Sequence, residues 1–90
     1  MNSLGPSADP RAVHLSIDDD ALTVDLADGR RLTVPLAWFP RLLHANPSQR
    51  CNWRFVGDGL GIHWPDVDED LSVEGLLKGS AAPGASKRAV

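Results

Sequence analysis

The chain has few of the residues that form disulfides, cysteine-based metal sites and membrane-spanning helices. Among its 90 residues Cys51 is the single cysteine, which excludes an internal disulfide and a cysteine-based zinc site. No run approaches the roughly 20 apolar residues that a membrane-spanning helix requires. Residues 1–10 show no basic-then-apolar signal pattern. We therefore expect a cytoplasmic protein.

Clustered positive charge is also missing. The formal net charge is −3, and the acidic residues gather at 18–20 and 66–70, whereas the basic residues are scattered from Arg11 to Arg88. A protein that binds duplex nucleic acid needs lysines and arginines in a cluster to displace counterions from phosphates. Direct nucleic-acid binding is therefore disfavoured.

The length allows one small domain. Residues 1–11 and 80–90 are rich in Gly, Pro, Ser and Ala without an apolar period, so we predict a single domain at 12–79 between two disordered segments. A domain of this size buries only about 60% of its unfolded surface. Its core must therefore use large side chains, and the candidates are Trp38, Trp53, Trp64, Phe39 and Phe55 with many Leu and Val.

Three segments between Val13 and Val34 alternate apolar and polar residues, which predicts an antiparallel meander with one buried face. A three-residue loop at 27–29 pairs Leu22 with Val34 and Val24 with Leu32, so apolar side chains share a face. This loop places Gly29 in the left-handed region, and we predict a positive φ there.

The second hairpin requires a different turn. With Asp58-Gly59 as a two-residue type I′ turn, Phe55 faces Ile62, Trp53 faces Trp64, and Arg54 lies opposite His63 on the polar face. The large apolar side chains then share one face. The three tryptophans consequently predict core packing rather than an exposed aromatic platform.

Three short helices complete the prediction. One runs through residues 36–45 and starts near Ala37, because Pro40 is tolerated only in a first turn. The second starts at Asn46, with Pro47 at N1 and Gln49 closing a capping box. The third is capped by Ser72 and ends at Gly79. The predicted fold class is α+β in two layers: an antiparallel meander plus a β-hairpin, with short helices packed on one face.

With these elements placed, the segments VPLAWFPRLLHANPSQRCNW and GDGLGIHWPDVDEDLSVEGLL give the chain a resemblance to a small bacterial family known as domain of unknown function 2442. The resemblance covers about Val13 to Gly79 and implies an α+β domain without an established activity or catalytic residues. Some relatives append a helix-turn-helix, for which 80–90 is too short. Members of the family also lie beside other small proteins, as toxin–antitoxin pairs do.

The acidic segment 66–70 admits three interpretations. Asp66, Asp68 and Asp70 form the D-x-D-x-D opening of a calcium loop, but Leu71 and Leu77 occupy the positions that require Gly and Glu. A solvated acidic bend is the first interpretation. An acidic docking surface for a basic partner and a divalent-metal site are the others.

His63 beside Asp66 has the residue types of a general base. Neither Cys51 nor Ser72 is placed as a nucleophile, and a histidine that holds the Trp64-Pro65 exit by a hydrogen bond is the simpler interpretation. We therefore predict no catalytic residues, no cofactor and no metal ligands, and not an enzyme.

We favour a non-enzymatic, antitoxin-like interaction module that binds a protein partner, such as the product of a neighbouring gene, and that can form a homodimer through a free sheet edge. The alternatives are a sensing or dimerising domain of a transcriptional regulator whose DNA contact is made elsewhere, and a small metal-dependent or His/Asp hydrolase. The candidate interaction surface comprises Arg54, His63, Asp66, Asp68, Glu69 and Asp70.

Overall fold

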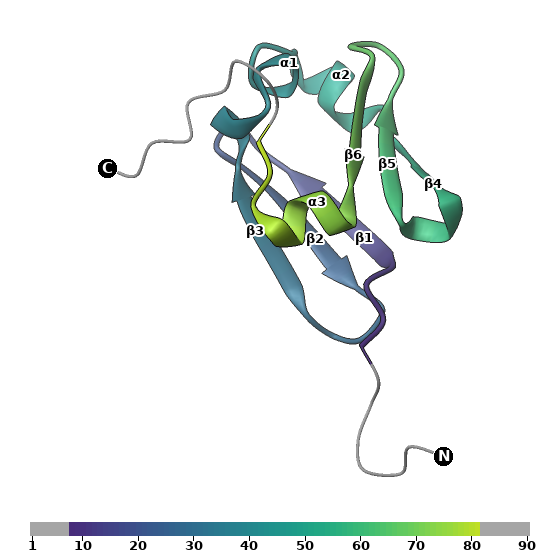
Figure 1. The fold of residues 1–90 in the computed structure, drawn as a ribbon. Coiled ribbons are helices and arrows are strands. Elements are labelled where there is room, and N and C mark those ends of the chain that lie inside the picture. Colours follow the sequence, from purple (N-terminus) through teal and green to yellow (C-terminus); the bar gives the residue numbers. More distant parts are fainter. Residues whose placement is uncertain (1–7, 82–90) are drawn as a thin grey trace, which may run out of the picture.

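The computed structural model describes residues 8–81, which form two three-stranded antiparallel sheets and short helices (Figure 1). In chain order the elements are β1 (Ala12–Ile17), β2 (Ala21–Leu26), β3 (Arg31–Pro35), the 3-10 turn η1 (Leu36–Trp38), α1 (Pro40–Leu43), α2 (Pro47–Cys51), β4 (Arg54–Val56), the 3-10 turn η2 (Gly57–Gly59), β5 (Gly61–Trp64), β6 (Glu69–Ser72) and α3 (Val73–Lys78). The predicted α+β class is confirmed. The segments predicted to be disordered fall mostly on residues 1–7 and 82–90, which lie outside the described residues.

The β1–β3 sheet forms one layer, and α3 crosses its face (Figure 1). The β4–β6 sheet stands beside it, while α1 and α2 cover the end nearest the β5–β6 turn. The buried core therefore lies between elements from both halves of the chain. Its members are Ala12, Leu15, Leu22, Val24, Leu26, Val34, Leu36, Phe39, Leu42, Ile62, Trp64, Val73 and Leu76, with Trp38, Trp53 and Phe55 partly buried against them.

The first sheet has the predicted register. Leu22 faces Val34 and Val24 faces Leu32, and both Leu22 and Val24 are fully buried. The N–H of Leu26 donates to the carbonyl oxygen of Arg30 at 2.8 Å. The φ of Gly29 is +95°. The three-residue loop with a left-handed glycine is thus confirmed.

The predicted two-residue turn of the second hairpin is also confirmed. Phe55 pairs with Ile62 and Arg54 with His63. Asp58 (φ 57°, ψ 33°) and Gly59 (φ 90°) both have the positive φ that a type I′ turn requires. A Cβ atom on Gly59 would lie 2.6 Å from the carbonyl oxygen of Ala12, so this glycine also lets the turn pack against β1.

The second sheet has a third strand that we did not predict. Residues 66–70 are not one acidic bend: the chain turns at Pro65–Asp68, where Asp68 has a φ of +53°, and returns as β6 along β5. Without β6, the second edge of β5 would leave its N–H and C=O groups unpaired. Pairing along this edge draws Glu69 and Asp70 into a strand, although their sequence indicates a loop.

The boundaries of the helices are set by proline and by the capping residues. The helix predicted over 36–45 is broken at Phe39 (φ −132°, ψ 84°), and α1 begins at Pro40. The reason is that a residue preceding proline is disfavoured in the α conformation. The capping box between Asn46 and Gln49 is confirmed. So is the cap of α3, where the Ser72 hydroxyl accepts from the N–H of Gly75.

Arg50 is a buried charged residue that joins the two halves of the fold, and the sequence did not single it out. Its guanidinium donates to the carbonyl oxygens of Leu42 at 2.9 Å and Leu43 at 2.7 Å, and pairs with Asp19 in the β1–β2 turn at 2.6 Å. Its own carbonyl oxygen accepts from Nε1 of Trp64 at 3.0 Å. The Arg50 side chain therefore satisfies the end of α1 and ties it to the first sheet, while the Arg50 backbone holds Trp64 of β5.

Candidate functional site

Arg54, His63 and Asp70 form a row across the outer face of the β4–β6 sheet, which we call the outer row. The register pairs Arg54 with His63 and His63 with Asp70. Nδ1 of His63 lies 2.6 Å from Oδ1 of Asp70, and the Asp70 side chain is 70% exposed. The sequence predicts that His63 holds the Trp64-Pro65 exit by a hydrogen bond to an aspartate or a backbone carbonyl. The structure supplies it from Asp70, because β6 brings that residue opposite His63, rather than from Asp66.

The other residues of the predicted interaction surface lie apart from the outer row. Asp66 is exposed at the β5–β6 turn, where its carboxylate accepts from Nδ2 of Asn52 at 3.0 Å. The carbonyl oxygen of Asp68 accepts from the guanidinium of Arg41. Glu69 pairs with Trp64, points to the inner face of the sheet and is 8% exposed. The expectation that Glu69 is solvated is wrong, because side chains alternate between faces along a strand and Glu69 falls on the inner one.

An apolar groove continues the outer face beyond the outer row. Ser72 pairs with Gly61, on the same face as Asp70 two residues earlier, and also lines this groove. Leu60 and Leu77 are 52% and 41% exposed, and the groove has a volume of about 410 Å³. Its lining residues are Pro10, Leu60, Ser72, Glu74 and Leu77.

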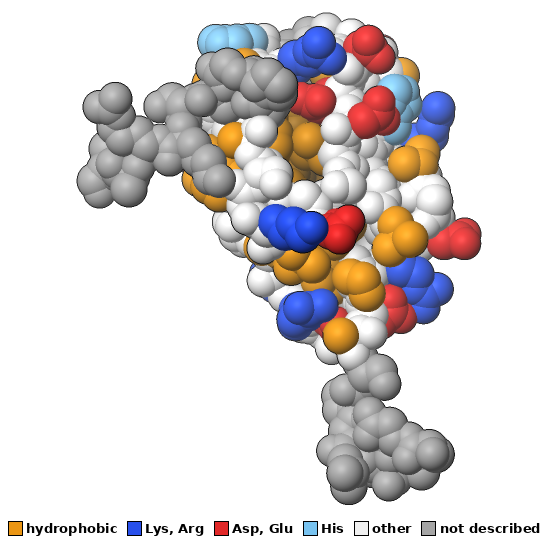
Figure 2. Space-filling model, viewed as in Figure 1, with side chains coloured by type: hydrophobic (Ala, Val, Ile, Leu, Met, Phe, Trp, Pro, Cys, Tyr) orange, Lys and Arg blue, Asp and Glu red, His pale blue; other side chains and the backbone are white. Residues whose placement is uncertain are grey.

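Val56 joins the outer row to the apolar groove. It is 37% exposed and pairs with Gly61, where a Cβ atom would lie only 2.9 Å from its side chain. Because Gly61 has no side chain, Val56 can lie over β5. Figure 2 shows hydrophobic side chains alongside charged ones on this face. Sequence reasoning missed the groove, since its residues precede β1, follow η2 or lie in β6 and α3, and no local pattern connects them.

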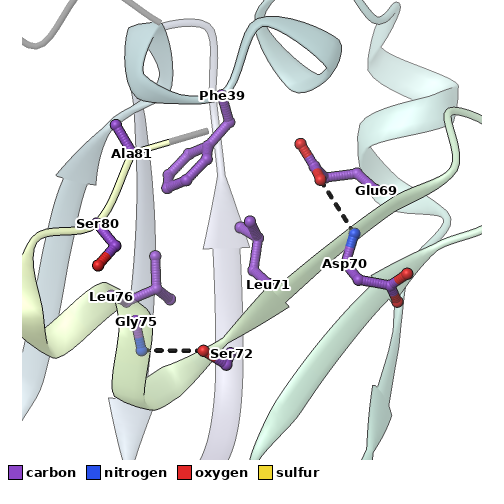
Figure 3. Close-up of a pocket in the computed structure, with 9 residues that line it drawn as sticks. All are labelled: Phe39, Glu69, Asp70, Leu71, Ser72, Gly75, Leu76, Ser80 and Ala81. Atoms are coloured by element: carbon purple, nitrogen blue, oxygen red, sulfur yellow. Dashed lines mark hydrogen bonds between the residues drawn. The ribbon is translucent and has the colours of Figure 1, made fainter. Parts of the chain in front are cut away.

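A second hollow lies on the inner side of β6. It has a volume of about 210 Å³ and contains the Glu69 side chain, facing Phe39, Leu71 and Leu76 (Figure 3). Oε1 of Glu69 accepts from the N–H of Asp70 at 3.1 Å. We call this hollow the Glu69 cavity.

The catalytic groups weighed from the sequence do not converge. The Ser72 hydroxyl caps α3, and Cys51 is exposed on α2. Within residues 8–81 no group of three or more His, Cys, Asp and Glu side chains is arranged to hold a metal ion. In the same range no helix is long and apolar enough to cross a membrane.

The carboxylates of the first sheet have stronger partners than those of the outer row. The Arg30 guanidinium and the backbone N–H groups of Asp9 and Arg30 lower the pKa of Asp28 from 3.8 to about 2. The backbone N–H groups of Asp20 and Ala21 likewise lower the pKa of Asp18. These acids therefore stabilise the turns that they belong to.

The fold and this surface define a class: a small α+β domain of two antiparallel sheets with an exposed, mixed apolar and charged face. Within that class, the chain belongs to the family described as protein of unknown function (DUF2442), whose model matches residues 12–82.

Two solved structures are similar to this chain. A protein of unknown function from Rhodospirillum rubrum has 32% sequence identity and a TM-score of 0.71, over 82% of this chain and 92% of that one. An uncharacterized protein from Chromobacterium violaceum shares the fold at 22% identity and a TM-score of 0.68, over 82% of this chain and 70% of that one. No curated protein matches the chain.

Proposed function

We propose that this domain is a non-enzymatic, antitoxin-like interaction module of the cytoplasm, which binds a partner protein through the outer face of the β4–β6 sheet. The observation that carries the proposal is the continuity of the outer row with the apolar groove. Interfaces combine an apolar centre with a polar rim. On this face Leu60 and Leu77 supply the centre, and His63 and Asp70 supply part of the rim.

The charges on this face indicate the chemistry of the partner. Asp66, Asp68 and Asp70 are exposed around the β5–β6 turn, and Glu74 lines the apolar groove. With a chain net charge of −3, the complementary partner is a segment that places apolar side chains in the groove and basic side chains beside the turn. The product of a neighbouring gene is the first candidate.

The two parts of the surface have different roles in binding. Burial of Leu60 and Leu77 removes apolar area from water, which lowers the dissociation rate. The exposed carboxylates attract a basic partner over a distance that salt shortens to about 8–10 Å at physiological ionic strength. They therefore raise the association rate at low salt.

The test is a binding titration of the full chain with the neighbouring gene product, at two salt concentrations. We expect Leu60→Ser with Leu77→Ser to weaken affinity at least tenfold. Asp68→Asn with Asp70→Asn should slow association several-fold and reduce its salt dependence. Asp20→Asn, which removes an exposed charge from the first sheet, is the matched control and should bind as the wild type does.

Two results would oppose the proposal. One is a complex whose affinity does not change in the Leu60→Ser, Leu77→Ser variant. The other is the absence of binding to the neighbouring product together with no crosslinked partner on this face in the native organism. Light scattering of the unbound chain shows whether two copies form a homodimer through the same groove. The leucine substitutions would dissociate such a dimer.

A further inference from the structure

Glu69 is an acidic side chain that the fold buries against apolar neighbours. It is 8% exposed, because its position opposite Trp64 directs it to the inner face of the second sheet. A carboxylate removed from water is unfavourable unless hydrogen bonds or an opposite charge replace its hydration. The hydrogen-bond donors and positive charges near Glu69 therefore decide whether its lost hydration is replaced.

Those partners are few. Oε1 accepts from the N–H of Asp70, the next residue along the chain, at 3.1 Å. Arg41, a cation of helix α1, donates instead to the carbonyl oxygen of Asp68. Across residues 8–81, no lysine, arginine or histidine forms an ion pair with Glu69. The described part of the chain thus gives this largely buried side chain one backbone hydrogen bond and no counter-charge. Its second oxygen still reaches solvent, because no side-chain oxygen within residues 8–81 is both buried and without a hydrogen-bond partner.

The cavity around this carboxylate has the size of a single side chain. Its volume is about 210 Å³, below the roughly 300–1,000 Å³ of sites that hold drug-sized ligands. Phe39, Leu71 and Leu76 line it with apolar surface (Figure 3). It therefore suits a narrow apolar stem that ends in a positive charge, as the lysine side chain does.

We propose that the Glu69 cavity binds an alkylammonium group, with the ammonium at the Glu69 carboxylate and its methylene stem along Phe39, Leu71 and Leu76. One carboxylate oxygen already accepts a backbone N–H, which favours the point charge of an ammonium over the bidentate fork of a guanidinium. The site faces inward, away from the outer row, and does not depend on the interaction surface proposed above.

The same chemistry has three possible sources: a free amine, a lysine of another protein, and the chain's own Lys87. Ala81 lines the cavity and Lys87 follows it in the sequence. A Lys87→Gln variant separates the last source from the other two, because it removes only the internal ammonium.

The experiment titrates n-butylamine into the isotope-labelled full chain at neutral pH and follows the backbone amide signals by NMR. The neutral control is 1-butanol. We expect saturating shifts at Asp70, Leu71 and Gly75 with butylammonium, contacts from its methylenes to the Leu71 and Leu76 methyl groups, and no saturation with 1-butanol. Glu69→Gln keeps an acceptor for the Asp70 N–H and should weaken binding at least tenfold.

The outcomes distinguish the chain's own lysine from an amine outside the chain. Tighter binding in Lys87→Gln assigns the site to the chain's own lysine, whereas equal binding assigns it to an external amine. No saturable shift in either chain, an equal response to 1-butanol, or full affinity in Glu69→Gln would overturn the proposal. The comparison of butylammonium with 1-butanol on the unmodified chain decides the question even where Glu69→Gln does not fold.

Discussion

The two sheets use their acidic residues in different ways. In the β1–β3 sheet the turn carboxylates accept from backbone N–H groups, as Asp18 does from Asp20 and Ala21. In the β4–β6 sheet, Asp70 pairs with a histidine on the outer face and Glu69 is buried without a counter-charge among residues 8–81. In the first sheet the carboxylates hold the turns, whereas in the second sheet one carboxylate lies on the exposed outer face and another is buried on the inner face.

The largest effect on stability is expected at Trp64, a fully buried residue of the second sheet. We expect Trp64→Ala to lower the free energy of unfolding by about 3–5 kcal/mol, since it opens a large cavity. It also removes the hydrogen bond from Nε1 to the Arg50 carbonyl oxygen. Urea unfolding followed by circular dichroism measures the loss.

Trp53→Ala is the matched control for Trp64. Trp53 is partly buried and tilts against Phe55 with ring centroids 4.8 Å apart, so we expect a loss of about 1–2 kcal/mol. Equal losses in the two variants would show that the difference in burial between Trp64 and Trp53 does not decide their contributions to stability.

Arg50 tests how the two halves are joined. Arg50→Ala leaves the carbonyl oxygens of Leu42 and Leu43 without their donor, and we expect a loss of about 2–4 kcal/mol. Asp19→Asn removes only the ion pair, whose Asp19 side chain is 88% exposed, and should change stability by about 0–1 kcal/mol. Chemical unfolding of both variants gives the comparison. If Asp19→Asn were the more damaging change, the ion pair rather than the helix carbonyls would join the halves.

The smallest predicted effect is on the pH dependence of stability. Asp28 has a pKa of about 2 in the folded protein against an ordinary value of 3.8. Because folding lowers this pKa, its stabilisation is present above pH 3.8 and is lost as the pH falls toward 2. The melting temperatures of wild type and Asp28→Asn should therefore differ at neutral pH and approach each other across that window.

Arg30→Gln sharpens the Asp28 prediction. It removes the largest cause of the lowered pKa and keeps the backbone donors, so its stability should depend less on pH than that of the wild type. Thermal melts at several pH values between 7 and 2 measure all three proteins. A constant difference between wild type and Asp28→Asn over this range would contradict the role assigned to the Asp28 carboxylate.

Most of the architecture could be read from the sequence, but less of the candidate site. The Asp58-Gly59 turn predicts Arg54 opposite His63, because it fixes their register, and the structure confirms this pair. The sequence also predicts a bend at Asp70 and a solvated position for Glu69, and both predictions are wrong. Both errors have one origin: β6 forms by pairing with β5, and its acid-rich sequence carries no strand signal.

Features that depend on neighbours along the chain follow directly from the amino-acid sequence. The loop ending at Gly29, the type I′ turn at Asp58-Gly59 and the capping box of Asn46 each follow from φ preferences and nearby hydrogen bonds. Three features arise only when distant segments pack together: the third strand of the second sheet, the burial of Glu69 and the position of Arg50 between the two halves. The physical reason is that these features satisfy backbone groups and fill space left by distant segments, which a local pattern does not encode.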